Sequence, residues 1–426
     1  MAKLALFGGK KIRTKPFAAH PVFGAEEKKE VLEVLATGQL SGFVANAGET
    51  FYGGPKVRKL EEEFKLYFGV KHAMTVNSAT AGLHAALAAI DVGPGDEVIV
   101  PPYTMSASAS AILMHNAIPV FADIQEDIFT LDPASIKKAI SSRTKAILVV
   151  HLFGHPADMT PIMKLAKQHK LRVIEDCAQA PGAIYHGKYV GTIGDMGIFS
   201  FNQHKTITTG EGGVVVTNDD ELALRVRLVR NHGEVIVKNL PPRQITGILG
   251  WNYRMTELEA AVGIAQFRKL DKLTDHRIAL ANYLTTELKK LNLPGLILPK
   301  TDRDCKHVYF VYPIKYIEKE IGIPRNLFVK ALNAEGIPFG AGYVQPIYLE
   351  PMYQKQICYG DLGCPFKCPL YKGKTDYRKG INPICERMHF EELFSTALCR
   401  YPLTKKDIDD VISGIKKVYE NRKELK

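Results

Sequence analysis

The feature that most limits the fold of this chain is an alternation of apolar runs and amphipathic stretches between about residues 26 and 270. Several of the runs are rich in β-branched residues and do not alternate with polar ones; they lie at residues 96–100, 145–150 and 171–174. Such runs are typical of strands buried on both faces of a mainly parallel sheet. Because helix-like stretches such as residues 133–140 and 161–169 separate them, the pattern predicts an open, doubly wound α/β domain.

At 426 residues the chain is too long for one small core, which favours two domains. A helical pattern begins after Met255, runs towards Leu291 and ends before Pro294. The remainder predicts a smaller α+β domain, with a strand near residues 308–314 and helices near 324–335 and 405–421. We therefore predict three parts, namely an N-terminal arm over residues 1–25, a large α/β domain over 26–270 and a C-terminal α+β domain over 271–426.

The overall composition is that of a globular protein, with 46% hydrophobic and 24% charged residues. There is no apolar run of about 18 residues to cross a membrane, and the apolar stretch from Leu4 to Phe7 is too short for a signal peptide. We expect a cytoplasmic protein without a membrane partner. The net charge of +11 is dispersed and forms no nucleic-acid module, so it suits a phosphorylated cofactor or a diphosphate substrate equally well.

The densest group of chemistry-bearing residues lies between Val173 and Thr217. The strand-like run that begins at Val173 ends with Asp176, and ligands of open α/β sheets bind beyond the carboxyl ends of the strands. Lys205 follows in a loop of small and polar residues that leads into another strand-like run at residues 214–216. A buried lysine without a permanent anionic partner loses its proton more readily, and the neutral amine can form a Schiff base.

Asp176 and Lys205 are the two residue types that a cofactor with a pyridine ring requires. A carboxylate opposite the ring nitrogen keeps that nitrogen protonated, and at about 4 Å with an effective dielectric near ~20 the pair is worth roughly 4 kcal/mol. The protonated ring then acts as an electron sink. Taken singly, Lys205 could still be a surface-loop lysine and Asp176 a helix cap.

A turn of small residues at positions 77–80 precedes an amphipathic helix predicted from Ala81 to Ile90. The free N–H groups and the dipole of such a helix make an anion site, although an ordinary N-cap is the commoner explanation of this pattern. Tyr103 follows two prolines at the end of a predicted strand. It could stack on a ring or fill the core.

Ordered motifs along nearly the whole chain resemble the DegT/DnrJ/EryC1/StrS family of sugar aminotransferases. The strongest is EDCAQAPGA followed by GDMGIFSFNQHKTITTGEGGVVVTND; the others are GGPKVRKLEEEF, NSATAGLHAAL, GPGDEVIVPPYT, VHLFGHPADM, RNHG, GWNYRMTELEAA and YPLT. The resemblance implies a fold-type I transferase dependent on pyridoxal 5'-phosphate. Members of this family are normally homodimers.

The resemblance also implies roles for the residues around the cofactor ring. Lys205 would form the Schiff base and later carry the proton between substrate carbon and cofactor. Asp176 would pair with the pyridinium nitrogen, and Gln179 would line the ring near its phenolic oxygen. Tyr103 would stack on the face of the ring.

A second set of residues is implied for the cofactor phosphate. Ser200, Ala79, Thr80 and the backbone N–H of Ala81 would hold it. Asn252 would reach the phosphate bound by the neighbouring subunit, so that the active sites of a homodimer are shared. A turn asparagine before the helix at Met255 is the alternative interpretation.

Two further functions remain open. The same family includes dehydratases that carry histidine in place of the catalytic lysine, and His204 lies beside Lys205; counting back from Gly210 places Lys205 at the catalytic position. A regulator without catalytic activity is the other alternative, but it would be free to lose Lys205 or Asp176, and both are present.

The seven cysteines are an odd number, which in a large cytoplasmic chain indicates reduced thiols. Cys358, Cys364, Cys368, Cys385 and His389 fall within 32 residues, and the first three of them lie in a Gly- and Pro-rich stretch from Tyr353 to Pro383 that we interpret as a long surface loop. They could imitate a zinc site, but their spacing is irregular. We predict no metal.

The sequence leaves the substrate open. The opening segment, the SGFVANAGETFYGGP stretch and the cysteine-rich loop resemble members that act on keto-cyclitols, whereas the usual substrates of the family are nucleotide-linked keto-sugars. The resemblance implies a ping-pong reaction in which glutamate or glutamine supplies the amino group.

Overall fold

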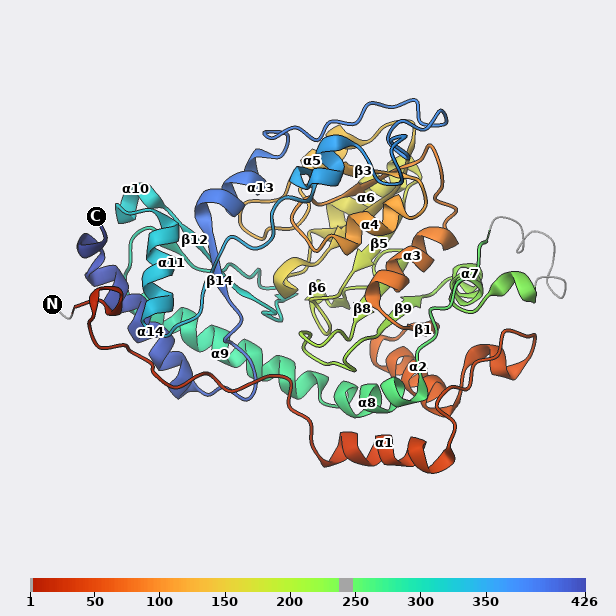
Figure 1. The fold of residues 1–426 in the computed structure, drawn as a ribbon, viewed down its shortest axis with the longest axis horizontal. Coiled ribbons are helices and arrows are strands. Elements are labelled where there is room, and N and C mark those ends of the chain that lie inside the picture. The colour runs from red at the N-terminus through yellow and green to blue at the C-terminus, as the bar shows by residue number, and fades with distance from the viewer. Residues whose placement is uncertain (1–2, 237–247) are drawn as a thin grey trace.

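The computed structural model describes residues 3–236 and 248–426, and its centre is a seven-stranded sheet of order β1-β9-β8-β5-β4-β2-β3 (Figure 1). The strands are β1 (His72–Val76), β2 (Glu97–Val100), β3 (Ile118–Phe121), β4 (Thr144–Val150), β5 (Arg172–Asp176), β8 (Met196–Ser200) and β9 (Gly213–Thr217). β9 is antiparallel to both neighbours and the other pairs are parallel. The predicted, mainly parallel sheet is confirmed.

Helices cover both faces of this sheet, and successive residues of one strand therefore pack into different apolar cores. In β4, Leu148 and Val150 belong to one apolar cluster, whereas Ile147 and Val149 belong to another. The first cluster packs against α3 (Ala79–Ala89), α4 (Ala107–Leu113) and α7 (Asp220–Arg230), and the second against α2 (Pro55–Phe68), α5 (Pro133–Ala139), α6 (Met159–His169) and α8 (Glu257–Phe267). Burial on both faces explains why the strand sequences show no polar alternation.

A second, antiparallel sheet of order β10-β12-β14-β13 carries the C-terminal part of the chain. Its strands are β10 (Leu296–Ile297), β12 (Tyr312–Tyr316), β13 (Gly340–Ala341) and β14 (Leu393–Thr396). A third apolar cluster lies between this sheet and α9 (Leu270–Leu291), α10 (Glu318–Ile321), α11 (Arg325–Ala334) and α14 (Lys405–Glu420). A small sheet of β6 (Ile184–Tyr185), β7 (Lys188–Tyr189) and β11 (Cys305–Lys306) links the two parts.

Two sequence predictions for this region were wrong in detail. The single helix predicted up to Leu291 is divided into α8 and α9 at Arg268 and Lys269, whose side chains pair with Glu63 and Glu27 of other helices. The strand predicted at residues 308–314 begins only at Tyr312, because the preceding residues bond to the large part of the molecule, with the Val308 N–H donating to the Gly154 carbonyl over 2.9 Å.

The stretch at residues 353–383 is not the surface loop that the sequence predicts. Between α12 (Pro351–Lys355) and α13 (Pro383–Arg387) it has no helix or strand, but Phe366, Tyr371 and Tyr377 are buried in a core of the large sheet. The Tyr377 hydroxyl donates to the Pro119 carbonyl on β3 over 2.9 Å, and the Tyr371 hydroxyl donates to Glu97 over 2.9 Å. This segment therefore covers the edge strand of the sheet.

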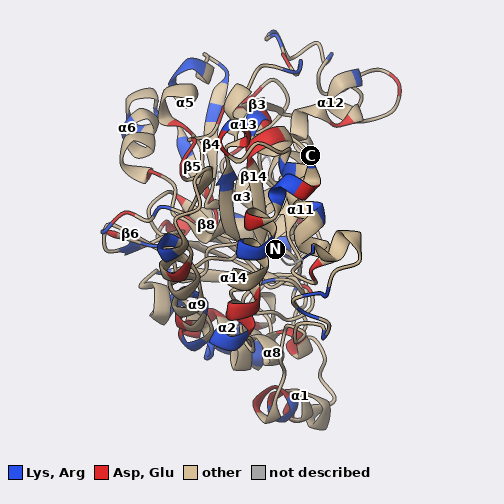
Figure 2. Cartoon of the chain, turned by 90° about the vertical axis from the view of Figure 1, so that its left-hand side faces the viewer, with Lys and Arg blue, Asp and Glu red and all other residues tan. Residues whose placement is uncertain are grey.

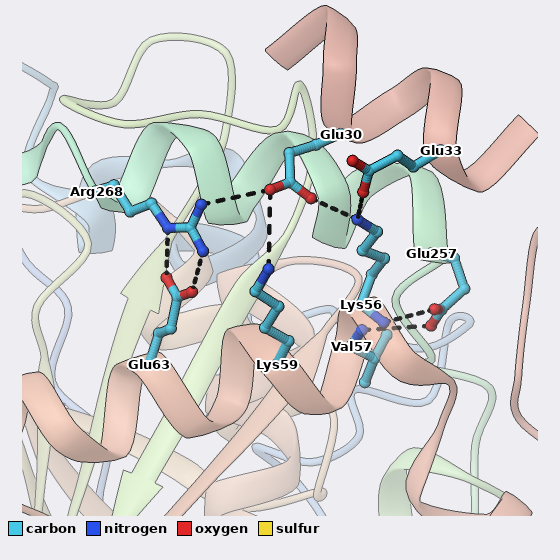
Figure 3. Close-up of polar contacts among 8 residues, drawn as sticks. All are labelled: Glu30, Glu33, Lys56, Val57, Lys59, Glu63, Glu257 and Arg268. Atoms are coloured by element: carbon cyan, nitrogen blue, oxygen red, sulfur yellow. Dashed lines mark hydrogen bonds and ion pairs between the residues drawn. The ribbon is translucent and has the colours of Figure 1, made fainter. Parts of the chain in front are cut away.

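The N-terminal arm runs along the molecule from the C-terminal part to α1 (Ala25–Thr37), which lies beneath α8 (Figure 1). Ion pairs fix α1 in place: Glu30 lies 2.5 Å from Lys56 and 3.4 Å from Arg268, and Lys56 also reaches Glu33 at 2.6 Å (Figure 3). α1 therefore turns its acidic face inward. Leu32 and Leu35, which are 64% and 53% exposed, point outward.

Charged residues of both signs are interspersed along the elements of the fold (Figure 2), in agreement with the dispersed positive charge. Among residues 3–236 and 248–426, no helix is long and apolar enough to cross a membrane. The predicted boundaries at residues 25 and 270 stay predictions.

Replacement of Tyr377 by alanine tests the packing of the cysteine-rich segment. Removing this buried ring should lower the free energy of unfolding by about 3 kcal/mol, because it leaves a cavity in the core. Leu362→Ala, in the same segment but 87% exposed, should change it by no more than about 0.5 kcal/mol. Urea denaturation measures both, and equal effects would contradict the packing described here.

Candidate active site

Four parallel strands end at one edge of the large sheet, and the predicted site residues follow them. β5 ends at Asp176 and β8 at Ser200, while β1 leads into the turn at residues 77–80 and β2 into the segment with Tyr103. Across β9, Gly213 pairs with both Val76 and Ser200, so the ends of β1 and β8 lie close together. The edge therefore gathers most of the predicted residues.

Asp176 is held by the protein on both carboxylate oxygens. The Ser108 hydroxyl donates to one oxygen over 3.0 Å, and the Ala178 N–H donates to the other over 3.0 Å. Burial raises the pKa of Asp176, and these donors and the charge of Lys205 oppose that shift. Ser108 on α4 is a positioning residue that the sequence did not reveal, because a serine within a helix carries no distinguishing signal.

Lys205 lies in the loop between β8 and β9, with its amine 4.9 Å from the centre of the Phe310 ring. Burial lowers the pKa of Lys205, and the negative charge of Asp176 opposes the shift. Among the residues that the structure describes, no hydrogen-bond acceptor or ion-pair partner meets this amine. Its neighbour His204 is exposed. Lys205, and not His204, thus has the environment that favours a neutral, nucleophilic amine.

Gln179 lies beyond Asp176 and is fixed at both ends of its amide. Its oxygen accepts from the Phe153 N–H over 2.8 Å, and its nitrogen donates to the Tyr343 hydroxyl over 2.9 Å. Tyr343 comes from the C-terminal part of the chain, so this bond joins that part to the edge of the large sheet.

Tyr103 does not have the open ring face that stacking on a cofactor requires. Its side chain is completely buried, packed edge-on against Tyr343 and His389, and its hydroxyl has no partner among the described residues. The core interpretation of Tyr103 is therefore the better one. Two residues later, Met105 is 59% exposed and offers an apolar surface at the same strand end.

The turn before α3 has features of both an ordinary N-cap and an anion site, the two interpretations that the sequence left open. Ser78 is the N-cap, and its hydroxyl oxygen accepts from the Ala81 N–H over 3.0 Å, so this N–H is already bonded. Within the described chain, the N–H groups of Ala79 and Thr80 have no acceptor. A Cβ on Gly213 would lie 2.8 Å from the Ala79 nitrogen, which shows how closely this turn approaches the start of β9.

Asn252 lies beside the same turn. Its carbonyl accepts from the Asn77 side chain over 3.5 Å, and its own side-chain oxygen accepts from the Arg254 guanidinium over 2.8 Å. The residue is exposed. A role towards a neighbouring subunit stays a prediction.

The residues at this edge fit a pyridoxal phosphate molecule. Asp176 is a buried carboxylate and Lys205 has a lowered pKa, and the same edge also carries Ser200 and the N–H groups of Ala79 and Thr80, which have no acceptor among the described residues. These groups match, respectively, a cationic ring nitrogen, an aldehyde and a phosphate.

His20 is a further residue at the site that sequence reasoning missed. One ring nitrogen lies 3.1 Å from the Lys205 carbonyl and the other lies 3.2 Å from the Tyr401 carbonyl. The N-terminal arm thus links the lysine loop to the C-terminal part of the chain. Nothing in the sequence of the arm distinguishes this histidine from a surface one.

The cysteine-rich segment does not gather a metal site. In the described parts of the chain, the one group of three close ligand-type side chains is His151, which follows β4, with Glu175 and Cys177, which flank Asp176 at the end of β5. There Glu175 accepts from the His151 ring over 3.0 Å and from the N–H groups of Gly191, Ile193 and Gly194. Its hydrogen bonds make Glu175 a structural carboxylate that anchors the following loop.

Replacement of Lys205 by methionine tests whether burial of the Lys205 amine lowers the free energy of unfolding. The folded state resists protonation of this amine, whereas the unfolded chain takes up a proton below about pH 10.5. Cofactor-free Lys205→Met should therefore be more stable than the wild type, by a margin that is absent above pH 10.5 and grows as the pH falls below it.

Urea denaturation of the cofactor-free proteins at pH 8 and near pH 10.5 measures this margin. Lys137→Met, at an exposed lysine, is the surface control and should bring no comparable gain. The quantity to compare is the stability of Lys205→Met minus that of the wild type. If this difference were smaller at pH 8 than near pH 10.5, the burial of a neutral amine would be contradicted.

Comparisons with known proteins agree with this geometry. The model of the DegT/DnrJ/EryC1/StrS aminotransferase family matches residues 25–371. The chain is 38% identical to a GDP-perosamine synthase of Caulobacter vibrioides, with 79% of this chain and 86% of that protein covered. It is 33% identical to a protein of Streptoalloteichus tenebrarius named as an L-glutamine:3-amino-2,3-dideoxy-scyllo-inosose aminotransferase, with 99% and 98% covered.

Among solved structures, an aminotransferase from Psychrobacter cryohalolentis superimposes with a TM-score of 0.82 at 32% identity, covering 95% of this chain and 99% of that one. The predicted fold class, a fold-type I transferase, is confirmed by this match and by the mixed sheet. The chain belongs to the DegT/DnrJ/EryC1/StrS aminotransferase family.

Proposed function

We propose that this protein is a pyridoxal-phosphate-dependent aminotransferase that moves an amino group from glutamate or glutamine to a keto-sugar or keto-cyclitol. The observation that carries the proposal is the pair Asp176 and Lys205 at the same edge of the sheet: a buried carboxylate, and an amine whose pKa burial lowers and that has no ion-pair partner among the described residues. When bound there, the cofactor would supply an electron sink that stabilises negative charge on the substrate carbon.

Residues of the chain would attach the cofactor, orient its ring and transfer the proton. The Lys205 amine would attach the cofactor and carry a proton to and from the substrate carbon, which requires the neutral form that burial favours. Asp176, oriented by Ser108 and the Ala178 N–H, would keep the ring nitrogen protonated. Gln179, fixed by Phe153 and Tyr343, would line the ring.

Phosphate binding would fall to the turn before α3 and to Ser200. The N–H groups of Ala79 and Thr80 point out of the first turn of a helix whose dipole favours an anion. The Ala81 N–H would contribute only by exchanging its bond to Ser78 for one to the phosphate. Met105, and not Tyr103, would offer the apolar contact to the ring.

The substrate class follows from the relatives. The protein from Streptoalloteichus tenebrarius, which the chain matches over nearly its full length, is named for a cyclitol ketone and for glutamine as donor, whereas the Caulobacter relative is named for a nucleotide-linked sugar. The full-length match supports a keto-cyclitol as acceptor. A dehydratase is disfavoured because His204 is exposed, whereas burial lowers the pKa of the neighbouring Lys205 amine.

We further propose that the protein is a homodimer in the cytoplasm. The segment from Val22 to Val44, which includes α1, exposes several apolar side chains, namely Val22, Phe23, Leu32, Leu35, Leu40 and Val44. A second copy would bury this surface. Asn252, exposed beside the turn at residues 77–80, would then contribute to the phosphate site of the neighbouring subunit.

Absorbance spectroscopy tests the proposed function. The wild-type protein with pyridoxal phosphate should be yellow, because a lysine-bound cofactor absorbs violet light, and adding glutamate or glutamine should remove that absorbance band. Lys205→Ala should lack both the band and turnover while keeping its fold by circular dichroism.

His204→Ala is the matched control, since it changes the exposed neighbour of Lys205. It should keep the band and at least about a tenth of the activity, because its side chain lies outside the site. A Lys205→Ala protein with full activity, or a wild-type protein whose bound cofactor neither donor converts, would refute the proposed function.

A further inference from the structure

A cavity of about 310 Å³ lies at the edge of the large sheet formed by β3. Its walls come from β3, from α5 and from residues 371–382 of the cysteine-rich segment. This volume is at the lower limit of cavities that hold small organic ligands. None of the residues that line it belongs to the candidate active site, so the cavity is separate from that site.

The backbone of β3 leaves one N–H group free on the side of the cavity. The Ala122 N–H donates to the Val100 carbonyl on β2 over 3.2 Å. Because alternate residues of a strand bond to the same neighbouring strand, Pro119 and Phe121 direct their backbone groups away from β2. The Pro119 carbonyl accepts from Tyr377, whereas the Phe121 N–H has no acceptor among the described residues. Phe121 therefore offers a free donor to the cavity that it lines.

Asn382 on the opposite wall has an amide that the fold does not use. The residue is 2% exposed, and its side-chain nitrogen has no acceptor within the described chain. Asn382 is the N-cap of α13, but the capping bonds go to Asp123, which accepts from the N–H groups of Ile384 and Cys385 over 2.9 Å each. A buried amide without an acceptor costs free energy unless a ligand or a water molecule supplies the bond. Rotation about its last torsion turns either its nitrogen or its oxygen towards the cavity.

The charged groups around the cavity favour an anion. Lys138 on α5 and Lys374 line it, and in the described part of the chain neither ammonium group has an ion-pair partner. The one carboxylate in the lining, that of Asp376, is held by the Arg378 guanidinium at 2.7 and 2.9 Å. The Ser135 oxygen accepts a backbone N–H over 2.7 Å, which leaves its own proton free to donate. The cavity thus presents several unused donors and no free carboxylate.

We propose that this cavity binds a small phosphorylated metabolite, with its phosphate between the two lysines, the Phe121 N–H and the Asn382 amide. A phosphate accepts hydrogen bonds on several sides, and lysine binds it as a point charge. A flat carboxylate is matched better by the fork of an arginine, and the lining contains none. Ile118, Val120 and Ile381 would contact the apolar surface of the ligand.

Such a ligand would connect parts of the chain that are distant in the sequence. Its donors come from β3, from α5 and from the cysteine-rich segment, so binding would fix that segment to the sheet edge that it covers. The site would be independent of the proposed function, because it shares no residue with the cofactor site.

Calorimetric titration with glucose 6-phosphate tests the site, with glucose as the unphosphorylated control. The protein is first loaded with pyridoxal phosphate and freed of the excess, so that the cofactor site is filled. Glucose 6-phosphate should bind and glucose should not. The double variant Lys138→Gln, Lys374→Gln should raise the dissociation constant about tenfold or more, as expected for the loss of charged hydrogen bonds. Lys137→Gln, an exposed neighbour on α5 that does not line the cavity, is the matched control and should change it by less than about twofold.

Hydrogen exchange followed by mass spectrometry locates the bound probe. Glucose 6-phosphate should slow exchange in the peptides that contain Phe121 and the residues around Asn382, and leave the peptide with Lys205 unchanged. Asn382→Asp, which replaces the amide by a carboxylate of the same shape, should abolish binding through charge repulsion. Thermal unfolding verifies that each variant is folded.

Absence of glucose 6-phosphate binding would overturn the site, as would equal weakening by Lys137→Gln and by the double variant. Protection confined to the Lys205 loop and the turn before α3 would also overturn it, since the probe would then occupy the candidate active site. Tighter binding of citrate than of glucose 6-phosphate would contradict the choice of a phosphate, because the cavity would then select carboxylates.

Discussion

The burial of one amine and one carboxylate at the carboxyl edge of the sheet is the constraint on which the site depends. Neither group is in its most stable environment, because burial lowers the pKa of Lys205 and raises that of Asp176. The surrounding fold offsets this cost with two large apolar cores and with bonds from Ser108 and the Ala178 N–H. A strained pair of this kind is typical of a functional site rather than of a structural ion pair.

The C-terminal part of the chain completes the same edge through several separate contacts. Tyr343 bonds Gln179, Phe310 covers the Lys205 amine, and His20 joins the lysine loop to Tyr401. The cysteine-rich segment closes the far edge of the sheet by burying Tyr371 and Tyr377. The two parts therefore build one site together, and residues distant in the sequence control the environment of the lysine.

The sequence predicted correctly those features of the fold that depend on a local pattern of residues. The strands that end at Asp176 and begin near Val214 were confirmed because burial on both faces leaves a distinct apolar run. Tertiary contacts decided the rest. Tyr103 is buried by Tyr343 and His389, α8 ends where Arg268 and Lys269 meet acidic partners, and the cysteine-rich segment packs inward on its tyrosines. Ser108 and His20 carry no local signal, since their roles arise only from neighbours far along the chain.

The central claim is that Lys205 is the residue that binds the cofactor covalently. Borohydride reduction of the protein loaded with pyridoxal phosphate, followed by peptide mass mapping, tests it directly. We predict that the peptide with Lys205 alone gains the mass of the reduced cofactor, and that prior incubation with the amino donor prevents the labelling. Labelling at another lysine, or no stable labelling, would contradict the account of this site.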